Sequence, residues 1–152
     1  MKKLSHIDRD GRPIMVDVSN KKNLYRVAKA RGRIKISPST VKLIADNRME
    51  KGNVLTVAEL AGINAAKRTF ELIPLCHPLA LTKVGVKAFV GNDDVVVTSE
   101  VACVGQTGVE MEALTAVGIA LLTVYDMCKA VDKNMIINEV VLLEKHKKNQ
   151  SK

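Results

Sequence analysis

Two charged residues that follow a long apolar stretch, Asp126 and Lys129, have the types and the spacing to move protons. The stretch from Ala113 to Tyr125 is uncharged, so a helix through it would place Asp126 at the margin of the core. Residues three apart lie on one face of a helix. A carboxylate and an ammonium there would shift each other's pKa, and a half-desolvated Lys can act as an acid or base near pH 7. The alternative is an ordinary helical ion pair.

The loop predicted at 73–79 holds a second set of reactive side chains, Cys76 and His77. Because Pro74 and Pro78 stand four residues apart, neither a regular helix nor a central strand can continue through it. Imidazoles titrate near neutral pH, so His77 could contact a substrate or act as a general acid or base. Taken alone, the loop favours a simpler role for His77, a hydrogen bond to a neighbouring carbonyl. Cys76 has no nearby base or helix N-terminus in the sequence, which favours buried packing over nucleophilic attack.

Two acidic residues, Glu110 and Glu112, stand where a helix is predicted to begin, just after residues 105–108 (GQTG). Acidic side chains in a first turn ordinarily interact with the helix dipole, which is the simplest interpretation. Glu112 and Asp126 are 14 residues apart, which is roughly 21 Å along a continuous helix. One small substrate bound to one subunit could not easily contact both. If both are functional, the sequence therefore predicts a site between subunits.

Cations flank the helix predicted over 53–70. Lys51 precedes it and Asn53 is a suitable N-cap, so a Lys beside a helix N-terminus predicts an anion site. Lys67 and Arg68 stand near the other end, where complementing the helix dipole explains them at least as well. The sequence contains no Walker loop, no G-x-G-x-x-G and no recognisable metal-ligand spacing, which excludes nucleotide and metal sites of those kinds.

Composition and charge limit the classes of protein further. The 152 residues fit one domain, and a composition of 47% hydrophobic and 26% charged residues is close to the globular average. Residues 1–51 hold 14 basic and 5 acidic residues, whereas 52–143 hold 6 and 10. This imbalance favours a polyanionic partner, either a nucleic acid or a phosphorylated metabolite. With two Tyr, two Phe and no Trp, the chain offers few aromatic faces on which single-stranded nucleic acid could stack.

The order of the predicted elements indicates the fold class. Hydrophobic periodicity, caps and turn residues predict, from residue 24 onward, a strand, two helices, two strands, a long helix and a last strand. This order is typical of an α+β, ferredoxin-like β-α-β-β-α-β sandwich with an extra helix in the first crossover. The expected boundaries are 24–36, 38–47, 53–70, 84–90, 95–104, 109–132 and 135–143.

The segments outside this domain of 24–143 differ from it in composition. Residues 1–23 predict a loosely held arm with a short edge strand at 14–18, and 144–152 predict a basic, disordered tail of solvated lysines. The uncharged apolar stretch is too short to span a bilayer, and no apolar run of a signal peptide follows the N-terminus. Three distant cysteines without a C-x-x-C pair are typical of a reducing, cytoplasmic compartment.

Six segments together resemble a known family. They are 15–19 (MVDVS), 51–52 (KG), 65–69 (AAKRT), 72–79 (LIPLCHPL), 107–115 (TGVEMEALT) and 125–130 (YDMCKA). In this order they closely resemble the molybdenum cofactor biosynthesis protein C family, the cyclic pyranopterin monophosphate synthases. The resemblance runs from about His6 to Leu143, which is essentially the whole domain.

The resemblance implies a ferredoxin-like fold assembled as a homohexamer, a trimer of dimers, with the site at a dimer interface. It implies a lyase reaction in which 3′,8-cyclo-7,8-dihydroguanosine 5′-triphosphate rearranges to cyclic pyranopterin monophosphate and releases pyrophosphate. It requires no cofactor, although Mg²⁺ at the triphosphate would be physically sensible. We expect neither a nucleic acid nor a membrane as a partner.

Carried over residue by residue, the resemblance implies Asp126 as the catalytic acid or base, with Lys129 and Lys51 as its cationic partners. The substrate-binding positions that it implies are Arg26, Lys67, Leu75, Cys76, His77, Glu110, Met111 and Glu112. Cations at these positions would neutralise the triphosphate and the leaving pyrophosphate. A Lys–Asp pair with shifted pKa values would move the protons that building a pterin ring requires.

Two other classes of protein compete with the enzyme. A ferredoxin-like RNA-binding module would use the basic first third of the chain, but it predicts aromatic residues on the central strands, where Phe89 alone is available. A catalytically inactive interaction subunit is the second alternative. The presence of Asp126, Lys129, Lys51 and His77 argues against it.

Overall fold

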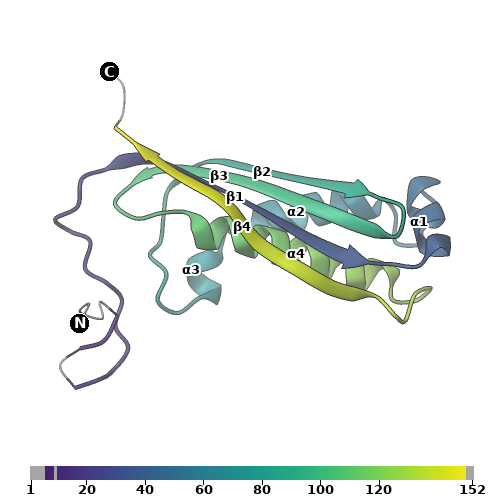
Figure 1. Cartoon of the computed structure of the whole chain (residues 1–152), viewed down its shortest axis with the longest axis horizontal. Coiled ribbons are helices and arrows are strands. Elements are labelled where there is room, and N and C mark those ends of the chain that lie inside the picture. Colours follow the sequence, from purple (N-terminus) through teal and green to yellow (C-terminus); the bar gives the residue numbers. More distant parts are fainter. Residues whose placement is uncertain (1–5, 9, 150–152) are drawn as a thin grey trace.

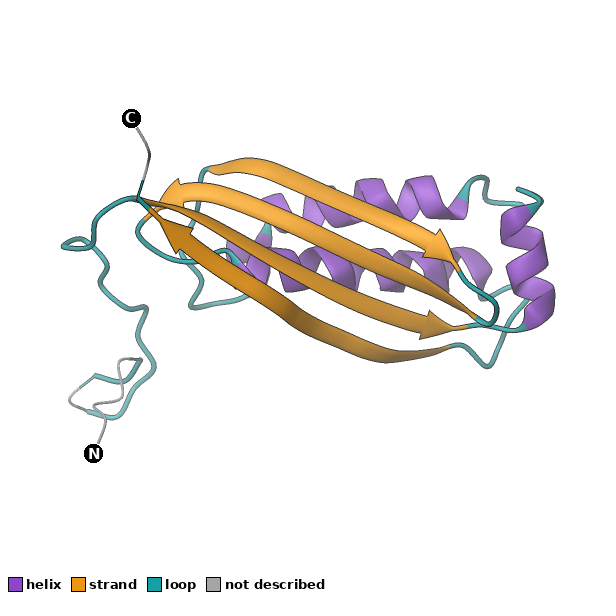
Figure 2. Ribbon diagram, turned by 45° about the horizontal axis from the view of Figure 1, so that its top comes forward, coloured by secondary structure: helices purple, strands orange, loops and turns teal. Residues whose placement is uncertain are grey.

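Four antiparallel strands form one sheet, in the order β2-β3-β1-β4, and helices α2 and α4 pack side by side on one of its faces (Figure 1, Figure 2). The computed structural model describes residues 6–8 and 10–149. The elements in chain order are β1 (Leu24–Lys35), α1 (Pro38–Ala45), α2 (Val54–Lys67), α3 (Thr69–Leu72), β2 (Leu81–Val90), β3 (Asp94–Gly105), α4 (Glu110–Cys128) and β4 (Ile136–Lys148). The predicted ferredoxin-like α+β fold is confirmed, with α1 as an extra helix in the first crossover.

Capping residues visible in the sequence begin the first two helices. Ser37 caps α1 by accepting a hydrogen bond from the Thr40 backbone amide at 3.3 Å, and Pro38 follows as the first helical residue. Asn53 caps α2 by accepting one from the Thr56 amide at 2.9 Å. Each cap satisfies an amide that has no partner inside its own helix. The position at which α1 ends and α2 begins in turn sets the path of the connection that carries Lys51.

The core lies between the sheet and the layer of α2 and α4, and small residues let these layers approach closely. A Cβ atom on Gly32 of β1 would lie 2.4 Å from Val117 Cγ1 and 2.6 Å from Leu121 Cδ1, both on α4. A Cβ atom on Gly62 of α2 would lie 2.8 Å from the Ala116 carbonyl oxygen of α4. Close packing of this kind leaves little freedom for displacement. It therefore fixes α4, and with it both of the helix ends that carry predicted site residues.

A Gly32→Ala substitution is expected to lower the free energy of unfolding by about 1–3 kcal/mol, because the added methyl group overpacks the interface between the sheet and α4. The Glu139 backbone oxygen, 2.9 Å from the same Cβ position, limits any relief by side-chain movement. Urea unfolding followed by circular dichroism measures the change. Gly85→Ala is the matched control, since its Cβ would meet a nearest atom at 3.8 Å. An equal loss in both variants would contradict this account.

The apolar character of α4 is explained largely by its place in the core. Nine of its residues are buried, from Glu112 to Cys128. By length and composition α4 is the one helix in the described part of the chain that could cross a membrane, but half of that stretch is buried inside this fold. Two of its large side chains, Leu122 and Tyr125, are nevertheless exposed.

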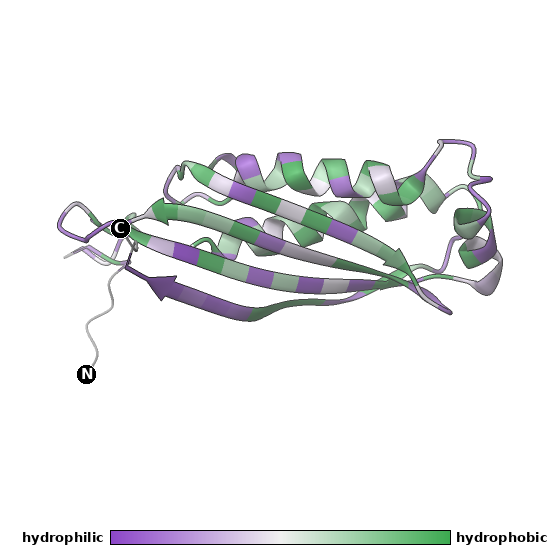
Figure 3. Ribbon diagram, turned by 90° about the horizontal axis from the view of Figure 1, so that it is seen from above, coloured by the Kyte–Doolittle hydropathy of each residue, from purple (hydrophilic) through white to green (hydrophobic). Residues whose placement is uncertain are grey.

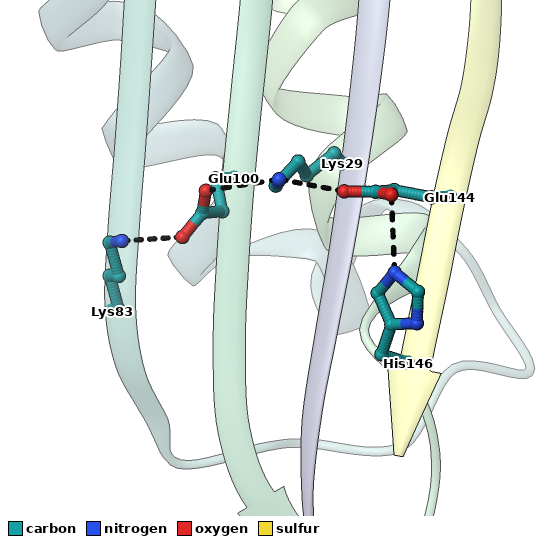
Figure 4. A network of polar contacts seen from close by, with 5 residues as sticks. All are labelled: Lys29, Lys83, Glu100, Glu144 and His146. Carbon is teal, nitrogen blue, oxygen red and sulfur yellow. Dashed lines mark hydrogen bonds and ion pairs between the residues drawn. The ribbon is translucent and has the colours of Figure 1, made fainter.

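The other face of the sheet is open and carries a row of ion pairs. Hydrophilic and hydrophobic residues alternate along its strands (Figure 3). Lys29 of β1 lies 2.7 Å from Glu144 of β4 and 3.8 Å from Glu100 of β3. Lys83 of β2 also contacts Glu100, and His146 lies 3.1 Å from Glu144 (Figure 4). This charged row crosses all four strands on the face where an RNA-binding module would present stacking aromatic rings.

The prediction of a disordered tail from residue 144 is wrong for residues 144–148. β4 extends to Lys148, with Lys145 opposite Ala28 and Lys148 opposite Tyr25 of β1. The pairing uses backbone groups, while the lysine side chains extend from an edge strand toward solvent, as edge strands favour. A basic run and a strand are therefore compatible. Residues 150–152 of the predicted tail lie outside the described residues.

Other details of the fold also differ from the predictions. Residues 14–18 form no strand, and the isolated bridge between Ile7 and Pro13 is the strand-like pairing in the described part of the arm. The helix predicted over 53–70 is divided at Arg68 into α2 and α3. α4 ends at Cys128 instead of residue 132; the following turn is tightened by an i→i−3 bond from the Val131 amide to the Cys128 carbonyl at 2.9 Å.

Candidate active site

The three residues predicted as catalytic meet in one charged cluster, which we call the Lys51–Asp126–Lys129 cluster. Lys51 Nζ donates to Asp126 Oδ2 at 2.7 Å and to the Asp126 carbonyl oxygen at 3.1 Å. Lys129 Nζ lies 2.6 Å from the other carboxylate oxygen, Oδ1. All three side chains are about half exposed. The carboxylate thus holds two ammonium groups at a surface that a charged substrate can reach.

The connection between α1 and α2 has a defined path that brings Lys51 to the end of α4. Two residues adopt left-handed backbone angles, Asn47 with φ of 52° and Gly52 with φ of 90°, conformations that Asn and Gly tolerate best. The Gly52 amide bonds to the Met49 carbonyl at 3.0 Å, and the Met49 side chain is buried. Lys51 therefore stands in a turn that is anchored to the core on one side.

The electrostatics of the cluster favour its fully ionised form. Hydrogen bonds from Lys129 and then Lys51 lower the pKa of Asp126 to about 2. The Asp126 carboxylate in turn raises the pKa of Lys129. The predicted half-desolvated Lys129 that titrates near pH 7 is therefore not observed, because the side chain is exposed and pairs with an anion. At neutral pH the cluster carries one negative and two positive charges, which suits a phosphorylated ligand.

The titration of Asp126 tests this electrostatic account. Its pKa of about 2 lies below the ordinary value of 3.8. Ionised Asp126 therefore stabilises the fold above about pH 4, and that contribution is lost as the pH falls from 4 toward 2. Carboxyl-carbon NMR should give a midpoint near 2, and both Lys129→Ala and Lys51→Ala should raise it, Lys129→Ala by more. A wild-type midpoint near 3.8 would contradict the ion pairs.

Six of the predicted substrate-binding residues line one cavity of about 380 Å³, which we call the α4 N-terminal pocket. The arm, the loop before β2 and the start of α4 enclose it. The six residues are Leu75, Cys76, His77, Glu110, Met111 and Glu112. Segments that are far apart in the sequence therefore form one hollow with polar and apolar walls, as small-molecule sites generally have.

His77 fastens the arm to this pocket. Its Nε2 atom lies 2.7 Å from the Val16 carbonyl oxygen, which is 61 residues away in sequence. The simpler predicted role is a hydrogen bond to a neighbouring carbonyl that settles the loop; His77 does contact a carbonyl oxygen, but that oxygen belongs to the arm, so the bond joins two distant segments instead. Burial, with a smaller contribution from Glu112, raises the pKa of the Cys76 thiol. Cys76 therefore stays protonated at neutral pH and is a poor nucleophile.

The two acids at the start of α4 have opposite environments. Glu112 is only 4% exposed, and burial raises its pKa. Burial also acts on Glu110, but Lys145 at 2.8 Å and the residue's own amide outweigh it, and the pKa of Glu110 is lowered. Two nearby carboxyl groups whose pKa values are shifted in opposite directions can play different roles. The group with the raised pKa can donate a proton, and the other stays an anion. This pair offers both kinds of group to a ligand in the α4 N-terminal pocket.

Arg26 and Lys67 do not line this pocket. Arg26 donates to the carbonyl oxygens of Gly105 at 2.9 Å and Gln106 at 3.0 Å. It lines an adjoining cavity of about 210 Å³ that shares Glu110 with the first. Lys67 lines another hollow, beside β2. Arg26 thus supports the backbone just before α4, and Lys67 faces a different surface.

The comparisons with known proteins decide the family. A sequence model of the MoaC family matches residues 15–148. The chain belongs to the MoaC family. It is 54% identical over 147 residues to a protein of Thermomicrobium roseum named cyclic pyranopterin monophosphate synthase, covering 95% of this chain and 89% of that protein. It is 56% identical over 144 residues to one of the same name from Rhodospirillum rubrum, covering 93% and 87%.

An archaeal relative extends the likeness to both ends of the chain. A Pyrococcus furiosus protein named probable cyclic pyranopterin monophosphate synthase is 50% identical over 156 residues, covering 98% of this chain and 99% of that protein. The MoaC match also continues to residue 148, five residues beyond the end of the resemblance noted in the sequence. The whole of β4 is therefore part of the family domain.

Several residues of this candidate site were not predicted from the sequence. The arm contributes His6, Val16, Val18 and Lys21 to the α4 N-terminal pocket. Val16 and Val18 lie in the family motif at 15–19, which was the available signal for them. The sequence did not indicate, however, which part of the fold the arm packs against. Lys145 was assigned to a solvated tail, whereas it pairs with Glu110. Within residues 6–8 and 10–149, no group of three His, Cys, Asp or Glu side chains is placed to hold a metal ion.

Proposed function

We propose that this protein is a cyclic pyranopterin monophosphate synthase of molybdenum cofactor biosynthesis. It converts 3′,8-cyclo-7,8-dihydroguanosine 5′-triphosphate to cyclic pyranopterin monophosphate and releases pyrophosphate. The observation that carries this proposal is identity of at least half of the aligned residues, over nearly the full length, to proteins that bear this name. The Lys51–Asp126–Lys129 cluster supports it, because it presents two cations and a carboxylate to a phosphorylated substrate.

The proposed chemistry uses these charges in two ways. A hydroxyl group derived from the ribose attacks the α-phosphorus and passes its proton to the carboxylate of Asp126; the bond from the α-phosphorus to the bridging oxygen breaks, and pyrophosphate leaves with that oxygen, as in a phosphorus–oxygen lyase. The lysines stabilise the charge on the transferring phosphate. The pKa of Asp126 is low because Lys129 and Lys51 hold its carboxylate. When substrate phosphates draw one of these lysines away, that pKa rises and the carboxylate becomes a better base.

Each proposed site is shared between subunits. The Lys51–Asp126–Lys129 cluster lies at the C-terminal end of α4 and the pocket at its N-terminal end. A helix of 19 residues is roughly 28 Å long, so one substrate cannot contact both ends in one chain. We propose a homohexamer, a trimer of dimers, in which one chain supplies the cluster and its neighbour the pocket. The exposed apolar residues Leu122, Val140, Val141, Leu142 and Leu143 provide surface for such contacts.

Oligomerisation tests the shared site directly. Size-exclusion chromatography with light scattering is expected to give a stable oligomer at assay concentration. Mixing an inactive Lys51→Ala chain with an inactive Glu112→Gln chain should restore part of the activity, since a mixed dimer contains one intact site. An active monomer, or the absence of any recovery in mixed oligomers, would contradict the shared site.

The remaining parts of the proposal concern cofactors and surroundings. The enzyme acts in the cytoplasm on a small phosphorylated purine derivative, without a nucleic-acid or membrane partner. It needs no resident cofactor. A Mg²⁺ ion would arrive with the triphosphate, whose oxygens are ligands that this ion prefers.

The deciding experiment incubates the purified full-length protein with the cyclic dihydroguanosine triphosphate. Pyrophosphate is measured by a coupled assay and the pterin product by its oxidised fluorescent derivative. Stoichiometric appearance of both is expected. Neither product, with substrate binding intact, would favour the inactive interaction subunit. Tight RNA binding without turnover would favour the RNA-binding module.

A further inference from the structure

The loop after α4 holds a buried acid that the proposed reaction does not use. Asp132 is 6% exposed. Its Oδ2 atom accepts hydrogen bonds from the Ser37 amide at 2.7 Å and the Thr40 hydroxyl at 3.0 Å, and its Oδ1 atom accepts one from the Asn134 amide at 3.1 Å. Burial opposes the charge on Asp132, but these bonds outweigh it and lower its pKa. Asp132 is therefore an ionised, fully partnered carboxylate, and such a group is costly to disturb.

The bonds of Asp132 join two segments that carry the Lys51–Asp126–Lys129 cluster. Ser37 and Thr40 belong to the first turn of α1, which stands at one end of the sheet (Figure 1, Figure 2). The eight residues of α1 lead into the connection that carries Lys51. On the other side, the Asp132 amide bonds to the Cys128 carbonyl in the last turn of α4, next to Lys129. Asp132 thus links the segment that leads to Lys51 with the segment that carries Asp126 and Lys129.

We propose that Asp132 is a positioning residue that ties the first turn of α1 to the segment just after α4, so that Lys51 reaches Asp126. Its consequence for turnover rests on the proposed function, whereas its consequence for geometry does not. An interaction that ties two rigid segments together can place a reacting group within the narrow range that catalysis needs. The competing account is that Asp132 adds only stability and leaves the cluster unchanged.

The pKa of Asp126 is a readout that stability alone would not change. Lys129 and Lys51 are the charged groups that lower it, so retreat of Lys51 should raise the midpoint from about 2 toward 3.8. We expect Asp132→Ala to raise it in carboxyl-carbon NMR of the full-length protein. Asp132→Asn should raise it less, because the amide oxygen can still accept from Ser37 and Thr40. In this variant the side-chain amide nitrogen would face the backbone amide of Asn134, so only the hydrogen bond from Asn134 would be lost.

Kinetics supplies the second readout. A displacement of about 1 Å at a reacting group can cost as much as 10²-fold in rate, so kcat in Asp132→Ala should fall by about 10- to 100-fold, with a much smaller change in KM. Ser99→Ala is the matched control. The Ser99 hydroxyl is also buried and donates to the Ala113 carbonyl at 2.8 Å, near the other end of α4. This control should lower the melting temperature without changing the Asp126 midpoint, since Ser99 contacts the end of α4 opposite to the cluster.

A lower melting temperature with an Asp126 midpoint still near 2 and an unchanged kcat would overturn the proposal. If Asp132→Ala does not fold, Thr40→Val decides, because it removes one bond to the same carboxylate. A small upward shift of the Asp126 midpoint is then expected, and no shift would overturn the proposal. Should the wild-type protein show no turnover, the proposed function would fail, while the NMR result would still decide the role of Asp132.

Discussion

Asp126→Asn is expected to lower single-turnover rates by a factor on the order of 10² or more while leaving substrate affinity nearly unchanged. Asn keeps the shape of the side chain and can still accept a hydrogen bond from Lys51 or Lys129, which now lie at 2.7 and 2.6 Å. It can neither accept nor return a proton, and it no longer raises the pKa of Lys129. Binding should survive, because two cations remain at the cluster and the carboxylate that competed with the phosphates for them is gone.

Three measurements on one preparation separate catalysis from structure for Asp126. Melting temperature reports the fold, calorimetry with a non-reacting triphosphate analogue reports binding, and a rapid-quench assay reports the rate. Because the pair is exposed, loss of a purely structural ion pair would change stability only slightly and would leave the rate unchanged. A destabilised variant with the wild-type rate would place Asp126 among the structural ion pairs and remove it from the proposed mechanism.

Lys51→Ala and Lys129→Ala are each expected to reduce kcat by a factor on the order of 10²–10³, which is the effect of removing one preorganised charge from a transition state. The fold should persist, because both side chains are about half exposed and neither fills the core. Lys51→Arg should recover only part of the rate, since a guanidinium keeps the charge but its planar, larger head does not match the geometry in which the compact ammonium of Lys51 meets Asp126. Pyrophosphate release under single-turnover conditions is the measurement.

The matched control for the lysines is Lys87→Ala. Lys87 is an exposed lysine of β2 that lies 3.7 Å from Glu59 and belongs neither to the cluster nor to the lining of the pocket. It should leave the rate and the melting temperature unchanged. Near-normal pyrophosphate release from Lys51→Ala or Lys129→Ala would contradict the roles assigned to them. A similar loss from Lys87→Ala would show that net positive charge matters, and not the position of these two groups.

The features that could be predicted from the sequence are those in which the signal and its effect lie close together. Ser37 and Asn53 cap helices that begin one residue later, so the donor and acceptor belong to the same turn. Asp126 and Lys129 form the expected pair because a helix places residues three apart on one face. The order of strands and helices follows in the same way from periodicity and turn residues. Each of these depends on a few neighbouring residues.

The charged run at the end of the chain shows where such reasoning is insufficient. Lysines at 145, 147 and 148 look the same in the sequence whether they are solvated in a tail or stand on an edge strand. What decides is that β1 has an unpaired edge along which residues 144–148 can extend. The same pairing places Lys145 beside Glu110, a contact across 35 residues that no local pattern indicates.

By itself the sequence determined the element types, the helix starts, the family motifs and the residues with suitable chemistry. The tertiary structure decided which of them meet. Lys51 reaches Asp126 across 75 residues because close packing at Gly32 and Gly62 fixes α4 and a turned connection brings Lys51 to its end. His77 meets Val16 because the arm folds back over the loop before β2. Local signals reflect backbone preferences over a few residues. These long-range contacts depend instead on how whole elements pack, and packing is a property of the complete chain.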